Sequence, residues 1–153
     1  MRVVLLLFVM LISTFVDATA QDIPMFTKED FAKIRFLEGR WVGKAPDGTE
    51  FYEEYAFPSD VEMRSLRATD NTFANFSDGS VVAFEDGSVT SKWGEFEWRA
   101  SSISSDAVHF EPINAPSSFS WQRRSTDEVA VIQKWTDEGG EAQSYAITLN
   151  RIK

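Results

Sequence analysis

The sequence contains no cysteine. Without thiols the chain forms no disulfide bond, carries no cysteine-linked lipid, and offers neither a thiol nucleophile nor a zinc–thiolate site. Its stability must therefore come from the packing of side chains. Aromatic residues make up 14% of the chain and supply large apolar surfaces for that packing.

Histidine is almost as scarce, since His109 is the only one. A site with two histidine ligands is therefore impossible, and a Ser-His-Asp triad would depend on His109 alone. Its alternation with apolar neighbours points it toward solvent, and no Gly-x-Ser-x-Gly motif accompanies it. The acidic residues Glu95, Glu97 and 137–141 lack EF-hand spacing, so we interpret them as a solvated surface. We predict no metal, no cofactor and no catalytic residue.

Clusters of basic residues are also missing. The chain has 15 Lys and Arg against 24 Asp and Glu, a net charge of −9. Nucleic acids and anionic membranes bind proteins through grouped Lys and Arg, so we expect neither as a partner. We expect the negative charge to keep the protein soluble.

The only long apolar run lies at the start of the chain. Arg2 precedes Val3–Val16, which is almost wholly apolar, and Ala18-Thr19-Ala20 fits a small-residue cleavage site. The run is shorter than the roughly 18 to 20 residues of a membrane-spanning helix. We therefore predict a signal peptide over residues 1–20 and export to a periplasm or the extracellular space. After cleavage we expect no membrane insertion and one domain over residues 21–153.

One short helix is predicted first, followed by strands only. Thr27 is placed as an N-cap, apolar residues recur at helical spacing, and Gly39 can end a helix over about Lys28–Glu38. Alternating patterns and turn-forming residues then predict ten strands. These are Arg40–Ala45, Thr49–Phe57, Val61–Ala68, Ser80–Glu85, Ser88–Trp93, Glu95–Ser101, Ala107–Glu111, Phe119–Arg124, Glu128–Thr136 and Ala142–Arg151. Short connections favour an all-β, up-and-down antiparallel barrel of about 8 to 10 strands.

The Gly39-x-Trp41 pair after a short helix, together with a last strand ending in Asn150-Arg151, resembles the lipocalin and calycin superfamily. The resemblance implies that Gly39, Trp41 and Arg151 close one end of the barrel. On that basis Trp41 packs at the closed end and Arg151 lies across it.

A closer resemblance is to a family of small exported bacterial lipocalin-like proteins of unknown function. Its features are a leucine before Gly-x-Trp-x-Gly, a Glu-Glu segment with an aromatic, a proline turn, and a Met and an Arg on the next strand. Here they read Leu37, Gly39, Trp41, Gly43, Glu53-Glu54-Tyr55, Pro58, Met63 and Arg67. The chain departs from the family late, where 114–119 replaces a His-Asp-Phe-Pro-like segment, so no role of that histidine carries over.

The strand over Thr49–Phe57 offers the best candidate site. Alternation puts Phe51, Glu53 and Tyr55 on its more apolar face, which should point inward. A hairpin at Pro58-Ser59-Asp60 brings Arg67 near Glu53, and an unpaired inward charge would be costly. We predict an inward Glu53–Arg67 pair, which would be a polar anchor for a ligand or a purely structural pair; a register error would instead leave both residues in solvent. The candidate ligand-binding residues are Phe51, Glu53, Tyr55, Met63 and Arg67.

The other strand aromatics would either fill the barrel or line a pocket. Trp93 is grouped with Glu95 and Glu97 on the outside. The patterns together favour an exported protein that holds a small, mainly apolar molecule in its barrel. Two alternatives stay open: a barrel enzyme with an inward Glu or Tyr as its acid–base residue, and an envelope interaction module with a filled barrel. Asn75-Phe76-Ser77 matches a glycosylation sequon but predicts little alone.

Overall fold

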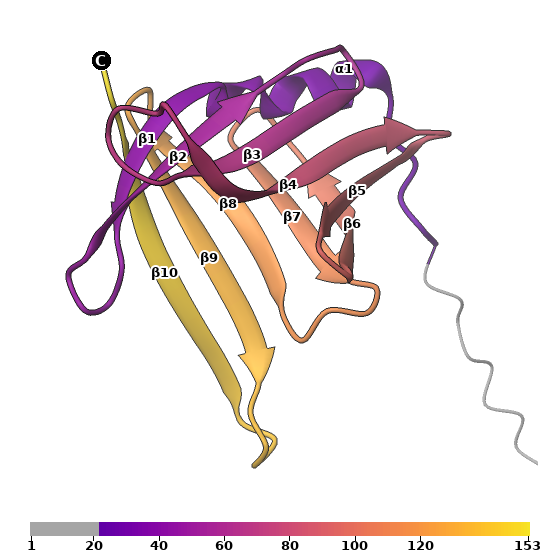
Figure 1. The fold of residues 1–153 in the computed structure, drawn as a ribbon. Coiled ribbons are helices and arrows are strands. Elements are labelled where there is room, and N and C mark those ends of the chain that lie inside the picture. The colour runs from indigo at the N-terminus through magenta and orange to yellow at the C-terminus, as the bar shows by residue number, and fades with distance from the viewer. Residues whose placement is uncertain (1–21) are drawn as a thin grey trace, which may run out of the picture.

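A computed structural model describes residues 22–153 of the chain. The predicted signal peptide, residues 1–20, lies outside the described residues. Ten antiparallel strands form one closed barrel, and each pairs with its neighbours in the chain until the last returns to the first (Figure 1). The strands are β1 Gly39–Lys44, β2 Glu50–Ala56, β3 Glu62–Ala68, β4 Phe76–Glu85, β5 Ser88–Trp93, β6 Phe96–Ile103, β7 Ala107–Pro112, β8 Ser118–Ser125, β9 Glu128–Thr136 and β10 Ala142–Arg151. The predicted all-β, up-and-down barrel with a short N-terminal helix is confirmed.

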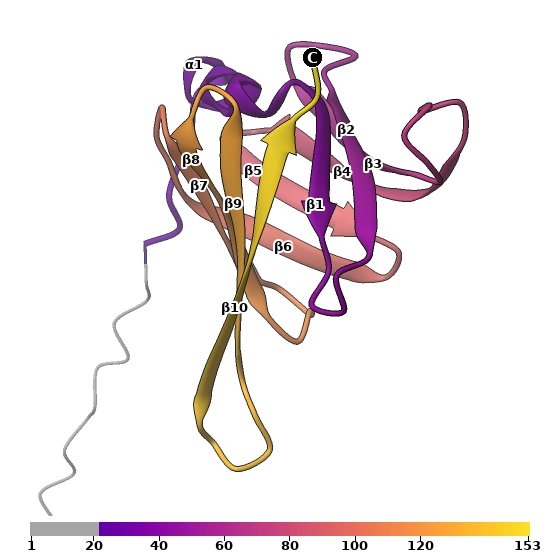
Figure 2. The ribbon, with the colours of Figure 1, turned by 90° about the vertical axis from the view of Figure 1, so that its left-hand side faces the viewer.

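The N-terminal helix lies over one end of the barrel (Figures 1 and 2). It begins as α1 (Lys28–Ala32), where Thr27 and Asp30 form a reciprocal capping box. It then tightens into a 3-10 segment, η1 (Lys33–Leu37), instead of continuing as an α-helix. The apolar residues of the whole segment recur every three positions, a repeat that lines up on one side of a 3-10 helix. This geometry turns Ile34 and Leu37 into the barrel, where both are fully buried.

Two strand boundaries differ from the predicted ones in ways that matter for the cavity. β4 begins at Phe76, earlier than the predicted Ser80. Gly94 and Glu95 form a two-residue turn between β5 and β6, with Gly94 at a φ of +58°, which suits glycine. The turn places Trp93 directly opposite Phe96, and Trp93 points inward rather than outward with Glu95.

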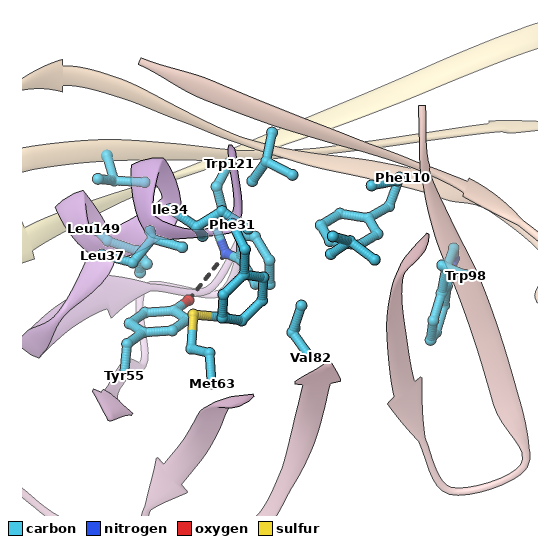
Figure 3. Packing of buried hydrophobic residues seen from close by; sticks show 14 of the residues in the cluster. Phe31, Ile34, Leu37, Tyr55, Met63, Val82, Trp98, Phe110, Trp121 and Leu149 are labelled. Carbon is cyan, nitrogen blue, oxygen red and sulfur yellow. Dashed lines mark hydrogen bonds between the residues drawn. The ribbon is translucent and has the colours of Figure 1, made fainter. Parts of the chain in front are cut away.

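The half of the barrel nearest the helix is solid. Its core contains large side chains from the helix and from most strands (Figure 3), chiefly Phe31, Ile34, Leu37, Trp41, Met63, Val82, Val108, Phe110, Val129 and Leu149. Trp41 is completely buried, and its Nε1 donates a hydrogen bond to the Leu37 carbonyl oxygen at 2.7 Å. The helix is thereby fastened to the first strand.

Arg151 covers Trp41 at this closed end. The two residues are paired across β1 and β10, and the Arg151 guanidinium carbon lies 4.1 Å from the centroid of the Trp41 ring. The guanidinium also donates hydrogen bonds to the carbonyl oxygens of Glu38 at 2.6 Å, Phe36 at 3.0 Å and Thr126 at 3.1 Å. Gly39 makes room for it, because a Cβ there would lie 2.6 Å from Arg151 Nη1. These contacts place Arg151 across the ring of Trp41, with Gly39 directly beside the guanidinium.

Within residues 22–153, no helix has the length and hydrophobicity needed to cross a membrane.

Candidate functional site

A cavity of about 380 Å³ occupies the barrel beyond the solid core. Its lining residues lie toward the strand ends that meet at the β1–β2, β5–β6 and β9–β10 turns, away from the helix. The lining consists of Phe51, Glu53, Tyr55, Ser65, Arg67, Asp78, Gly79, Ser80, Ser91, Trp93, Trp98, Phe119, Trp121, Val131, Gln133 and Ile147. This volume falls within the range of small-molecule sites.

The cavity has two chemically different walls. β5, β6 and β8 provide an aromatic wall, whose rings are Trp93, Trp98, Phe119 and Trp121. β2, β3 and β4 provide most of the polar groups, including all three charged side chains, Glu53, Arg67 and Asp78. A molecule in the cavity would therefore contact rings on one side and charged or hydroxyl groups on the other.

Glu53 organises the polar wall. Its Oε1 accepts a hydrogen bond from Arg67 Nη2 at 2.7 Å, and its Oε2 accepts one from the Tyr55 hydroxyl at 2.6 Å. The Tyr55 oxygen in turn accepts a hydrogen bond from Trp121 Nε1 at 3.1 Å, drawn as the dashed line in Figure 3. The guanidinium of Arg67 also lies 4.5 Å from the centroid of the Phe51 ring. One continuous chain of contacts thus runs across the cavity from β3 through β2 to β8.

Burial raises the pKa of the Tyr55 phenol well above its ordinary value, and the negative charge of Glu53 adds to that effect. The residue is only 2% exposed. Desolvation disfavours the charged phenolate, and the hydrogen bond to Glu53 requires the phenol proton. Tyr55 therefore stays protonated at neutral pH and acts as a fixed hydrogen-bond donor.

Four of the five predicted ligand-binding residues line the cavity together: Phe51, Glu53, Tyr55 and Arg67. Glu53 and Arg67 are directly opposite in the β2–β3 register, and they form an ion pair rather than pointing separately into solvent. Met63 does not line the cavity. It shares a face of β3 with Arg67 but lies deeper, fully buried in the core near Tyr55 (Figure 3).

Sequence reasoning missed several lining residues. Asp78, Gly79 and Ser80 come from β4; the predicted strand begins only at Ser80, and Asp78-Gly79 before it has the composition of a turn. Trp93 was placed outside, although its alternation with Val89 and Ser91, both buried, indicates the inner face. The sequence contains this alternation. It assigns Trp93 to the inner face only if the turn at Gly94-Glu95 is recognised, because Glu95 then no longer continues the strand.

His109, Glu95, Glu97 and the acidic residues of 137–141 do not line the cavity. His109 is partly buried on β7 and is not among the lining residues. Glu97 on β6 forms an ion pair with Lys92 on the neighbouring strand β5, at a distance of 3.5 Å. Among residues 22–153 there is no group of three or more His, Asp or Glu side chains placed to hold a metal ion.

No protein-family model matches the chain, and no curated protein matches it significantly. Two solved structures are similar in outline. The structure of EF1p2_mFAP2b bound to DFHBI is 13% identical, with a TM-score of 0.41, and the match covers 78% of this chain and 97% of that one. A redesigned beta barrel, b11L5F_LGL, is 12% identical, with a TM-score of 0.35, and the match covers 77% of this chain and 93% of that one.

Proposed function

We propose that this protein is an exported, lipocalin-like barrel that reversibly binds a small, mainly apolar molecule in the cavity. The supporting observation is the cavity itself, which has aromatic rings on one wall and a few fixed polar groups on the other. Small-molecule sites commonly combine an apolar lining with a few placed polar groups that orient the ligand.

The side chains of the polar wall hold one another in place. Arg67 is held by the carboxylate of Glu53 and by the ring of Phe51, although its side chain is 43% exposed at the cavity. A group held in place in advance loses little conformational freedom on binding. In this proposal the Glu53–Arg67 pair is the polar group that orients the ligand. The two side chains also neutralise each other's charge.

The two alternatives have weaker support. An acid–base enzyme would need a group that exchanges protons near neutral pH, but the raised pKa of Tyr55 keeps its proton in place. Both oxygens of Glu53 accept hydrogen bonds from protein groups. A filled barrel would leave no cavity, whereas here only the half near the helix is solid.

The test is native mass spectrometry of the protein purified from its own host, in search of a small molecule that co-purifies. A matched pair of variants connects any such molecule to the cavity. Ser80→Phe fills the cavity from β4, whereas Val81→Phe changes the next residue, which is 41% exposed and does not line the cavity. We expect Ser80→Phe to lose the molecule and Val81→Phe to keep it. A wild-type protein that is always ligand-free, or equal retention by both variants, contradicts the proposal.

The export component rests on the sequence pattern of residues 1–20. Cell fractionation followed by N-terminal sequencing tests it independently of ligand binding. A mature protein that begins near Gln21 outside the cytoplasm is the expected result. An intact Met1 on a cytoplasmic protein contradicts export and leaves the binding proposal standing.

A further inference from the structure

We infer that the ligand carries a positive charge, as an apolar or aromatic molecule with an ammonium group. This inference rests on the proposed binding function and specifies its ligand class. It follows from the balance of charge in the cavity and from the arrangement of the aromatic rings.

The cavity lining has one more negative charge than positive charge. Its charged side chains are Glu53, Arg67 and Asp78, and the first two neutralise each other through a 2.7 Å ion pair. Asp78 lies opposite Arg67 in the β3–β4 register, yet in residues 22–153 its carboxylate forms no ion pair within 4.0 Å. Its negative charge therefore remains available at the cavity, where a cationic ligand would complement it.

The aromatic wall adds a second attraction for a cation. Trp98 and Phe119 lie at 85° with ring centroids 5.4 Å apart, and Phe119 and Trp121 lie at 81° with centroids 5.0 Å apart. Neighbouring rings of this wall therefore meet edge to face. The face of an aromatic ring is electrostatically negative, and surrounding rings of this kind bind ammonium groups through cation–π interactions, most strongly with Trp.

An anionic ligand would meet the opposite conditions. The only basic residue of the lining, Arg67, is already paired, and Asp78 lies beside it. The whole chain carries a net charge of −9, which attracts cations to the cavity and repels anions during encounter. The structure therefore favours the cation over an otherwise similar acid.

Three probes with the same ring system test the inference: (2-naphthylmethyl)trimethylammonium, 2-naphthylmethanol and 2-naphthylacetate. Isothermal titration calorimetry gives their affinities for the wild-type protein at low and at moderate salt. We expect the ammonium probe to bind about tenfold more tightly than the alcohol, because cation–π contacts add to ring burial. The acetate should bind most weakly. Added salt should weaken binding of the ammonium probe by screening its attraction, strengthen binding of the acetate by screening its repulsion, and leave the alcohol unchanged.

Asp78→Asn removes the unpaired charge without changing the size of the side chain. We expect this variant to bind the ammonium probe about three- to fivefold more weakly, the range for an exposed ion pair, with the alcohol unaffected. Asp86→Asn is the matched control, since it makes the same change in charge in the β4–β5 turn, at the other end of β4. Asparagine also tolerates the positive φ of 47° there.

The outcomes separate this inference from the proposed function. Equal affinities for the ammonium probe and the alcohol, or an equal effect of both Asn variants, would overturn the inference and leave the apolar binding site standing. Tightest binding of the acetate, lost in Arg67→Met, would replace the cation with an acid at the same site. Failure of all three probes to bind would count against both proposals.

Discussion

Glu53 and Arg67 face each other across β2 and β3, and their side chains form a 2.7 Å ion pair that is more exposed on the Arg67 side, at 43%, than on the Glu53 side, at 13%. Because the pair is open to solvent, we expect Glu53→Gln or Arg67→Met to cost roughly 1 kcal/mol of unfolding free energy. A double-mutant cycle by urea denaturation should give a coupling energy of similar size. A coupling energy of zero would contradict this prediction, because the pair would then add nothing to stability.

Replacing Arg151, which lies over the Trp41 ring, should cost more unfolding free energy than breaking the Glu53–Arg67 pair. Arg151→Met eliminates the cation–π contact and three hydrogen bonds to carbonyl oxygens, so we expect a loss of about 2 to 4 kcal/mol. Urea denaturation measures the loss. Arg124→Met is the matched control, because Arg124 is exposed on the surface. A loss no larger than in the control would contradict the closing role of Arg151.

The buried phenol of Tyr55 leads us to expect a specific dependence of folding stability on alkaline pH. Its pKa is raised in the folded state, so the unfolded chain releases the phenol proton at a lower pH than the folded protein does. The contribution of this group to stability is complete below the ordinary tyrosine pKa, near pH 10, and declines as the pH rises above it. We expect Tyr55→Phe to be less stable at neutral pH and to lose stability less steeply above pH 10.

Urea denaturation at a series of pH values between about 8 and 11, a range set by the ordinary tyrosine pKa of about 10, gives the free energy of unfolding of each protein and so the two slopes. Tyr145→Phe serves as a control on β10, at a position that does not line the cavity. If the wild-type protein and Tyr55→Phe have parallel stability profiles above pH 10, the burial of this phenol does not control the alkaline loss of stability.

Gly43 provides a packing prediction. A Cβ at this position would lie 2.5 Å from Phe51 Cζ and 2.8 Å from Leu149 Cδ2. Gly43→Ala should therefore displace the ring on which Arg67 rests and cost about 1 to 3 kcal/mol, as overpacking does. Gly139→Ala is the control, because the atom nearest to a Cβ there would be a side-chain oxygen of Asp137 at 3.3 Å. Thermal unfolding compares the two variants, and equal melting temperatures would contradict the tight contact.

The overall barrel was predictable because the patterns that indicate it lie within single strands and the turns between them. Alternation and turn residues mark each of the ten strands, and the short connections permit little besides a meander. The Glu53–Arg67 pairing was predictable for the same reason, since one short connection, residues 57–61, joins the two adjacent strands and sets their register.

What sequence alone did not predict depends on contacts between distant strands. Whether the aromatics fill or line the barrel depends on how far the helix and the core extend along its axis, which no local pattern encodes. Met63 and Arg67 have the same alternation, yet one is buried in the core and the other lies at the cavity. Depth along a strand, unlike the choice of face, is fixed only by the tertiary structure.

The pairing of β1 with β10 joins parts of the chain that are far apart in sequence; Glu38 and Arg151, which share a hydrogen bond there, are separated by 113 positions. Joining such distant segments costs entropy before any contact compensates for it, so we expect barrel closure to come late in folding. A chain still being synthesised, before β10 emerges, would present an open sheet with two unpaired edges, which are sites for aggregation. The arrival of the last strand is then the step that ends this vulnerable period and protects the new protein from its own copies.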